Sequence, residues 1–245
     1  MTTVLKLGGS VVTEKDRPET VAEERLDRCA AAIEGTGDLV VVHGGGSFGH
    51  HHASRHGVTA AAGSHDAAAA VDIHGAMKRL NDAVVAALGR HGVPAVPVHP
   101  FSAGTRDADG ALEFPHGQVE TMLGEGFVPV AHGDIVSHAG EGVTILSGDE
   151  LVAHLAAALA ADRVGLCSGV PGVLDADGEV IDRIDAVDEV AGALGDSDAT
   201  DVTGGMAGKV RTLLELPVGA SIFGPDDLAA FLAGGTPGTL VAGDG

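Results

Sequence analysis

Residues 43–52 read HGGGSFGHHH, in which three glycines, a serine, a phenylalanine and another glycine separate one histidine from three more. The stretch directly follows DLVVVH (38–43), a continuous apolar run that is typical of a buried strand in a parallel sheet. Glycines after such a strand let backbone N–H groups approach an anion closely, because no Cβ atom intervenes. Three interpretations follow: a phosphate-binding turn ending in a working histidine, a metal site, or a loop of small residues.

Three further segments share this glycine-rich character: KLGGS (6–10), SGDE (147–150) and TGGMAGK (203–209). Each is expected at the end of a strand or the start of a helix, so all four would meet at one edge of a parallel sheet. None has the Walker pattern GxxxxGK[ST]. Of the four lysines, Lys6, Lys15 and Lys209 lie in or beside glycine-rich stretches, where a compact positive charge could reach phosphate oxygens. These turns predict a ligand with several phosphates.

Apolar runs alternate with helical patterns along the whole chain, which predicts one α/β domain with a mainly parallel sheet covered by helices on both faces. The expected strands are 4–7, 38–43, 93–99, 127–136, 163–168, 221–224 and 239–243. The expected helices are 19–33, 66–89, 117–125, 147–161, 203–216 and 225–233. Two DADG sequences predict hairpin turns within 105–114 and 175–181.

The chain has 35 Asp and Glu against 14 Lys and Arg, a net charge of −21. Such a balance argues against nucleic acid or an anionic membrane as a partner and indicates adaptation to high salt. The longest apolar runs are too short to cross a bilayer, and the N-terminus leaves no room for a signal peptide. Two cysteines cannot form a disulfide framework, so we expect a cytoplasmic enzyme.

The motifs KLGGSVVTEK, VVHGGGSFGH, PVAHGDIV, LSGDE and DVTGGMAGK occur in this order. Together they resemble the amino acid kinase family, and HGGGSFGH is most similar to its isopentenyl phosphate kinase branch. The resemblance implies an open αβα sandwich in which residues 1–165 mainly bind the acceptor and residues 166–245 mainly bind the nucleotide. It also implies transfer of the γ-phosphoryl group of ATP to isopentenyl phosphate, with Mg²⁺ bridging ATP oxygens and a homodimer as the common assembly.

The resemblance further assigns roles to residues of this chain. Lys6 would hold the transferring phosphates, Lys15 would stabilise transition-state charge, and His50 would bind the phosphate of the acceptor. The expected ATP-binding residues are Lys6, Gly8, Gly9, Ser10, Gly45, Ser168, Gly204, Gly205 and Lys209, and those for the head of the acceptor are Gly44, Gly49, His50 and Gly148. The chain departs from the family at SGVPGVL (168–174), where two expected acids are missing; Asp175 or Asp177 could substitute.

An isoprenoid tail would need an apolar wall, for which Ala70, Ile73, Met77, Val130 and Ile145 are candidates, although any of them could equally be ordinary core. His51 and His52 are expected to be exposed residues at the start of a helix, and Lys78 to lie on a solvated helix face. Consecutive histidines project in different directions without an adjacent cysteine or carboxylate, so we expect no metal site formed by the protein.

Two other functions fit parts of the same pattern. One is a kinase of this fold acting on a phosphonate such as fosfomycin, or on an amino acid carboxylate. The other is a nucleotide sensor without turnover, against which the combination of Lys6, Lys15, His50 and Lys209 argues. An acceptor that is already an anion needs no general base, which fits a site built from lysines, glycine amides and one histidine.

Overall fold

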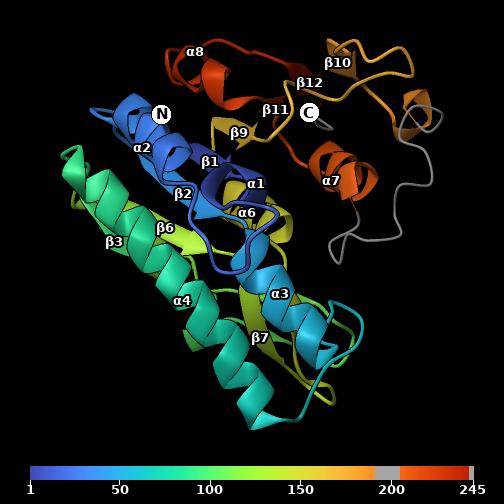
Figure 1. The fold of residues 1–245 in the computed structure, drawn as a ribbon. Coiled ribbons are helices and arrows are strands. Elements are labelled where there is room, and N and C mark those ends of the chain that lie inside the picture. The colour runs from blue at the N-terminus through green and yellow to red at the C-terminus, as the bar shows by residue number, and fades with distance from the viewer. Residues whose placement is uncertain (191–204, 243–245) are drawn as a thin grey trace.

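The fold is built around one eight-stranded sheet. A computed structural model describes residues 1–190 and 205–242 (Figure 1). Neighbouring strands run parallel except for one antiparallel pair, β11 with β12, which confirms the mainly parallel sheet. From edge to edge the strands are β10 (Arg183–Ile184), β12 (Thr239–Val241), β11 (Ala220–Phe223), β9 (Arg163–Cys167), β1 (Thr3–Leu7), β2 (Leu39–His43), β6 (Val128–His132) and β3 (Ala95–Pro97).

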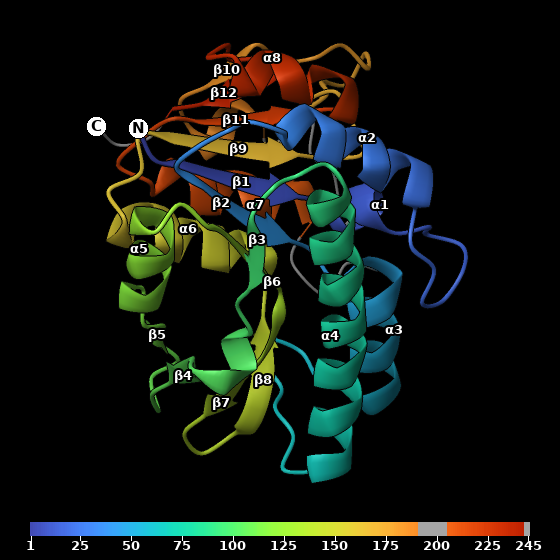
Figure 2. The same cartoon turned by 90° about the vertical axis from the view of Figure 1, so that its left-hand side faces the viewer.

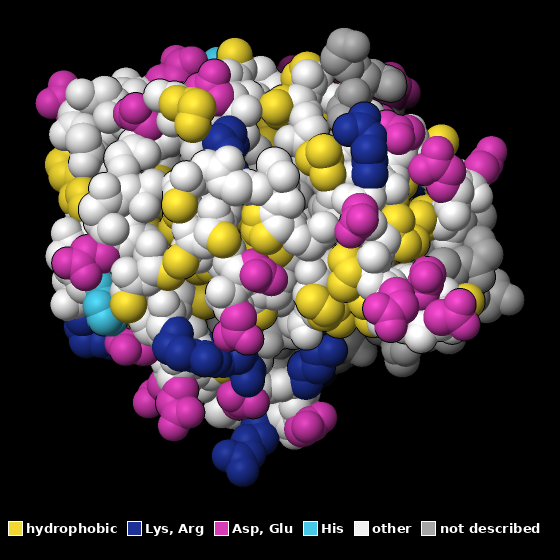
Figure 3. Space-filling model, turned by 90° about the horizontal axis from the view of Figure 1, so that it is seen from above, with side chains coloured by type: hydrophobic (Ala, Val, Ile, Leu, Met, Phe, Trp, Pro, Cys, Tyr) yellow, Lys and Arg dark blue, Asp and Glu magenta, His cyan; other side chains and the backbone are white. Residues whose placement is uncertain are grey.

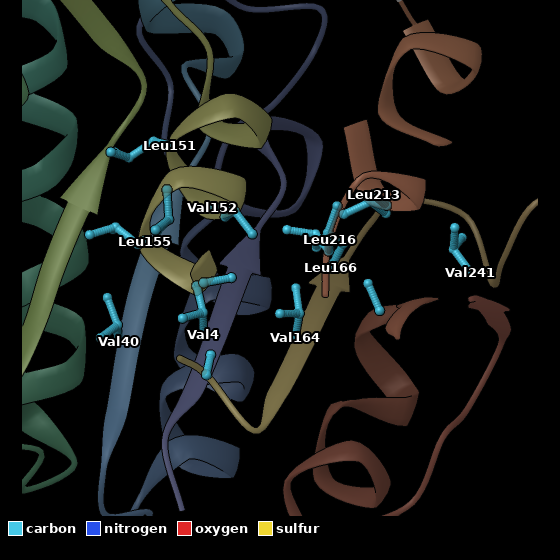
Figure 4. Close-up of a cluster of buried hydrophobic side chains, with 14 of the residues drawn as sticks. Val4, Val40, Leu151, Val152, Leu155, Val164, Leu166, Leu213, Leu216 and Val241 are labelled. Atoms are coloured by element: carbon cyan, nitrogen blue, oxygen red, sulfur yellow. The ribbon is translucent and has the colours of Figure 1, made fainter. Parts of the chain in front are cut away.

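Helices cover both faces of this sheet, as an αβα sandwich requires. One layer contains α2 (Glu23–Ile33), α4 (Ala67–Arg90) and α8 (Leu228–Leu232), and the other contains α5 (Gly117–Gly124), α6 (Gly148–Ala158) and α7 (Gly205–Leu214). Strand residues alternate between the two layers: Leu5 and Leu7 pack towards α2 and α8, whereas Val4 packs towards α6 (Figure 4). The same alternation sends the side chain of Lys6 towards α6 and α7.

A smaller sheet lies beside the lower part of α4 (Figure 2). Its order is β5 (Leu112–Glu113), β4 (Thr105–Arg106), β7 (Asp134–His138) and β8 (Gly142–Leu146). The single strand predicted for 127–136 is therefore wrong, because the chain leaves the main sheet at Gly133 and continues as β7 in the smaller one. Both halves begin with buried residues, so the apolar run continues across the break.

Other predicted elements differ mainly at their ends. Helix α2 begins at Glu23 rather than near Glu19, whose backbone lies in the left-handed region with φ 48°. Helix α1 (Gly9–Val12) was not predicted, and α3 (Gly46–His56) begins before the helix start expected at His51 and His52, because glycine is a poor helix former. Three short 3₁₀ segments, η1 (Pro100–Ser102), η2 (Val187–Glu189) and η4 (Pro225–Asp227), complete the described elements.

Other boundaries agree closely with the sequence. The side chain of Asp66 caps α4 and that of Ser147 caps α6, each accepting a bond from a backbone N–H of the first turn. Both DADG sequences form turns between paired residues. In the described ranges, no helix is both long enough and apolar enough to cross a bilayer.

Candidate active site

The glycine-rich turns meet around a cleft of about 1310 Å³ at the C-terminal edge of β1 and β2. Most of the predicted site residues lie along its walls: Lys6, Gly8, Gly9, Ser10, Lys15, Gly44, Gly45, His50, Gly148, Ser168 and Lys209. Gly205 is the first residue of α7, the helix that carries Lys209. Gly204 lies outside the described residues. The convergence of these segments, predicted from parallel topology, is therefore seen in the structure.

Two of the turns touch backbone to backbone. A Cβ atom built on Gly9 would lie 2.5 Å from the Gly46 nitrogen, and one built on Gly44 would lie 2.6 Å from the Gly9 nitrogen. Gly46 also has a positive φ of 46° and faces the Thr13 hydroxyl, which accepts a bond from the Ser47 N–H at 3.0 Å. These glycines bring the ends of β1 and β2 close enough together for their amides to line one wall.

Asp149 joins the two lysines that lie deepest in the cleft. Its carboxylate is 2.7 Å from the Nζ atom of Lys6 and accepts a hydrogen bond from the Nζ atom of Lys209 at 3.0 Å. Burial lowers the pKa of Lys6 to about 8, although Asp149 opposes the shift. Burial also disfavours the carboxylate form of Asp149, but Lys6 and Lys209 outweigh it and hold the pKa of Asp149 at about 2. The three groups form a charged centre with one excess positive charge when both lysines are protonated.

Asp149 was not among the predicted site residues, although the SGDE segment was singled out. An acid in the first turn of a helix is already accounted for by the positive N-terminal end of the helix. The pattern that could have revealed it is the combination of this acid with two lysines at the ends of other glycine-rich elements. Asp175 and Asp177 are the candidate substitutes for the two acids missing from SGVPGVL (168–174), and neither lines the cleft. The Asp175 carboxylate accepts bonds from the N–H groups of Asp177 and Glu179 and serves its own turn.

The three consecutive histidines of α3 point in different directions, because successive helix residues are rotated by about 100°. His50 and His51 are exposed and line the cleft. The prediction that His52 is exposed is wrong: its side chain is 5% exposed and lies between Glu19 and Asp72. Lys78 is exposed on α4, as predicted.

A small apolar cavity of about 40 Å³ adjoins the cleft. Ile73 and Met77 of α4, together with Ile145 of β8, line it, as do Gly49 and His50 of α3. Two other tail candidates do not line the cavity: Val130 is fully buried in the main core on β6, and Ala70 packs in the smaller cluster that also contains Ile73 and Ile145. Glycine at 49 matters here, since a Cβ atom would lie 2.9 Å from the Met77 sulfur.

Buried histidines support the floor of the site. His43 ends β2 and His132 ends β6, and their rings stack 5.4 Å apart. The Nδ1–H group of His43 donates to the Gly44 carbonyl and that of His132 donates to the Gly133 carbonyl, at 3.1 and 2.9 Å. Burial lowers the pKa of His43 to about 4, so the ring is neutral. Nε2 of His43 lies 3.1 Å from the side-chain amide of Asn81.

Residues 1–190 and 205–242 contain no group of three or more His, Cys, Asp or Glu side chains placed to hold a metal ion. Within the cleft, the buried carboxylate of Asp149 is engaged by two ammonium groups.

Comparisons with known proteins agree with this architecture. Residues 1–222 match the family model described as "Amino acid kinase family". A Haloferax volcanii protein named isopentenyl phosphate kinase is 63% identical over 244 residues, which cover 98% of each chain. A Methanocaldococcus jannaschii protein of the same name is 34% identical over 226 residues, 86% of this chain and 85% of its own.

Solved structures give the same relationship. One described as "X-ray structures of isopentenyl phosphate kinase" superposes with a TM-score of 0.83 at 29% identity and covers 98% of this chain and 100% of its own. A product complex of the Thermoplasma acidophilum enzyme superposes with a TM-score of 0.79 at 24% identity. The fold, the ordered glycine-rich motifs and these matches together show that the chain belongs to the amino acid kinase family.

Proposed function

We propose that this protein transfers the γ-phosphoryl group of ATP to isopentenyl phosphate, giving isopentenyl diphosphate and ADP. The observation that carries the proposal is that His50 lines both the cationic cleft and the small apolar cavity. An acceptor with a phosphate head and a short branched hydrocarbon tail can therefore place its head at His50 and its tail between Ile73, Met77 and Ile145. Relatives named isopentenyl phosphate kinase support the same assignment.

The reaction brings two highly negative groups together, so charge neutralisation and positioning dominate catalysis. An anionic oxygen of the acceptor attacks the γ-phosphorus, and the bond from that phosphorus to the bridging β–γ oxygen breaks as ADP leaves. Lys6 and Lys209, which both pair with Asp149, offset the negative charge of the phosphates. Lys15 stabilises the charge on the transferred group from the cleft wall, and His50 fixes the phosphate of the acceptor.

Binding is divided along the chain. Residues 1–165 contribute most of the acceptor side, including His50 and the apolar cavity, and residues 166–245 contribute Ser168 and Lys209 to the nucleotide side. Mg²⁺ would be supplied with the ATP substrate and would offset part of the phosphate charge. In the cleft, the buried carboxylate of Asp149 is already paired with two lysines.

The experiment is an ADP-release assay at high KCl with three acceptors: isopentenyl phosphate, fosfomycin and glutamate. We expect ADP release that depends on isopentenyl phosphate, with ³¹P NMR showing a diphosphate product, and a large but measurable fall in kcat in Lys15→Met. ADP release with fosfomycin or glutamate instead would show that the protein is a kinase with a different acceptor. ATP binding without turnover on any acceptor would favour a nucleotide sensor.

A further inference from the structure

The segment 13–22 connects α1 with α2 and carries Lys15. Its base is closed by an antiparallel bridge between Thr13 and Val21 and by the bond from Glu14 N–H to the Thr20 carbonyl. Lys15, Asp16 and Pro18 line the cleft. Whatever fixes the tip of this segment therefore also fixes where the ammonium group of Lys15 can reach.

Glu19 holds the tip through both of its carboxylate oxygens. Oε1 lies 2.6 Å from Nε2 of His52, and Oε2 accepts bonds from Nη2 and Nε of Arg79 at 2.8 and 3.2 Å. The bonds from His52 and then Arg79 lower the pKa of Glu19. Its backbone has a φ of 48°, a conformation that favours glycine and is uncommon for glutamate. A residue poorly suited to this backbone conformation is thus placed where its side chain bridges to α3 and α4.

His52 connects Glu19 with Asp72 on α4. Its Nδ1 atom lies 2.8 Å from Oδ2 of Asp72, so each ring nitrogen faces a carboxylate oxygen. A carboxylate can only accept, so both bonds form when both ring nitrogens carry hydrogens. The other charged or titratable groups around this ring are Arg79 beside Glu19, His56 and Arg55 beside Asp72, and the edge-on ring of His51.

We propose that Glu19 and His52 are positioning residues that hold the 13–22 segment against α3 and α4, so that Lys15 stays directed into the cleft. The role rests on the proposed kinase function, because it acts through Lys15.

The main test replaces Glu19 with Gly, which suits φ 48° and removes the bridging carboxylate. We expect kcat to fall by about tenfold to a hundredfold, the cost of misplacing a catalytic group by about 1 Å, with little change in the KM for ATP. Glu19→Gln, which keeps an acceptor for His52, should retain most of kcat. The matched control is Asp38→Gly: Asp38 is acidic and exposed and has φ 49°, but it lies just before β2 and away from the 13–22 segment.

A double-mutant cycle asks whether the effect passes through Lys15. If it does, adding Glu19→Gly to Lys15→Met should cause little further loss of kcat. Additive losses, or a wild-type kcat in Glu19→Gly, would overturn the proposal. Circular dichroism of each variant gives the folded fraction, to which kcat is normalised.

A readout without turnover separates this proposal from the proposed function. Endoproteinase Lys-C cleaves after lysine, and cleavage after Lys15 reports release of the segment. Glu19→Gly should be cleaved there several-fold faster than the wild type and Asp38→Gly, while Lys6, which is buried, stays protected. Unchanged cleavage would refute the proposal that Glu19 and His52 hold the 13–22 segment, even if the enzyme were active. If cleavage is faster in Glu19→Gly but the protein is inactive on every acceptor, Glu19 still holds the segment and the proposed kinase activity is refuted.

Discussion

His50, His51 and His52 occupy three environments on one helix: the proposed site for the phosphate of the acceptor, the cleft rim and a buried position between two carboxylates. We expect His50→Ala to lower kcat/KM for isopentenyl phosphate by about tenfold to a hundredfold, since a hydrogen bond to a charged group contributes about 1.5–3 kcal/mol. ATP affinity should be unchanged. His51→Ala should be close to the wild type, whereas His52→Ala should lower kcat through the Lys15 segment. Steady-state kinetics and calorimetric ATP titration measure these effects, and equal damage from all three substitutions would contradict the separation of roles.

The lowered pKa of Lys6 gives a second prediction for a single residue. Below pH 8 its ammonium is charged and can bind phosphate; as the pH rises through about 8, the free enzyme loses that charge. We therefore expect kcat/KM for ATP to fall on a basic limb with a pKa near 8. The limb in kcat should lie at higher pH, because bound phosphates stabilise the protonated form.

The control for this limb is Lys6→Arg, in which guanidinium stays charged throughout the range. If its turnover is too slow to follow, ATP affinity against pH gives the same comparison. A basic limb that persists unchanged in Lys6→Arg would mean that another group titrates.

Individual site residues differed in how far the sequence revealed them. Lys6, His50 and Lys209 lie inside glycine-rich motifs, and these motifs are typical of phosphate binding. His52 gave no such signal, because its partners Glu19 and Asp72 lie 33 and 20 residues away and only the packing of three elements brings them together.

At the scale of elements, the contact between the first two glycine turns can be tested. Gly9→Ala would force a Cβ atom against the backbone of Gly46, which cannot move aside as a side chain can. We expect the free energy of unfolding to fall by about 1–3 kcal/mol and activity to drop with it. Gly37→Ala is the control, since its Cβ atom would meet nothing within 4 Å. Urea unfolding measures both, and equal stability of the two variants would show that the turns have room to separate.

The apolar cavity gives a prediction about acceptor length. Replacing Ile73, Met77 or Ile145 with Ala should enlarge the cavity and raise the ratio of kcat/KM for geranyl phosphate to that for isopentenyl phosphate. The rise should reach at least about fourfold, the equivalent of one methylene group at about 0.8 kcal/mol.

Val130→Ala is the control for the cavity, because Val130 is buried in the main core and does not line it. This substitution should lower stability without altering the ratio. If none of the three cavity variants changes the ratio, the tail lies elsewhere.

Elements were predictable where their pattern was periodic and capped, as in α4 and α6. The break at Gly133 was not, because β6 and β7 belong to different sheets but begin with similarly buried residues. The first residues of α3, before His51, were also missed, because tertiary packing against α4 outweighs their weak intrinsic helix propensity.

At the scale of the whole molecule, the net charge of −21 predicts dependence on salt. Acidic side chains are spread over the face shown in Figure 3, with basic ones among them. Their repulsion is screened only weakly in dilute buffer, where the Debye length exceeds the ~10 Å found at ~0.1 M salt. We expect the melting temperature and activity to rise from dilute buffer to molar KCl. A melting temperature that stays flat over this range would refute the adaptation to high salt.

The position of β1 in the middle of the main sheet has a consequence for folding during synthesis on the ribosome. After this strand has emerged, β2 soon covers one of its edges, but the other edge pairs with β9, about 160 residues later in the chain. At about 5–20 residues per second, translation leaves that edge without its native neighbour for roughly 8–30 s. During this interval the nascent chain presents an apolar strand edge of the kind that recruits unrelated strands, so chaperone shielding should matter more before β9 is made than after it.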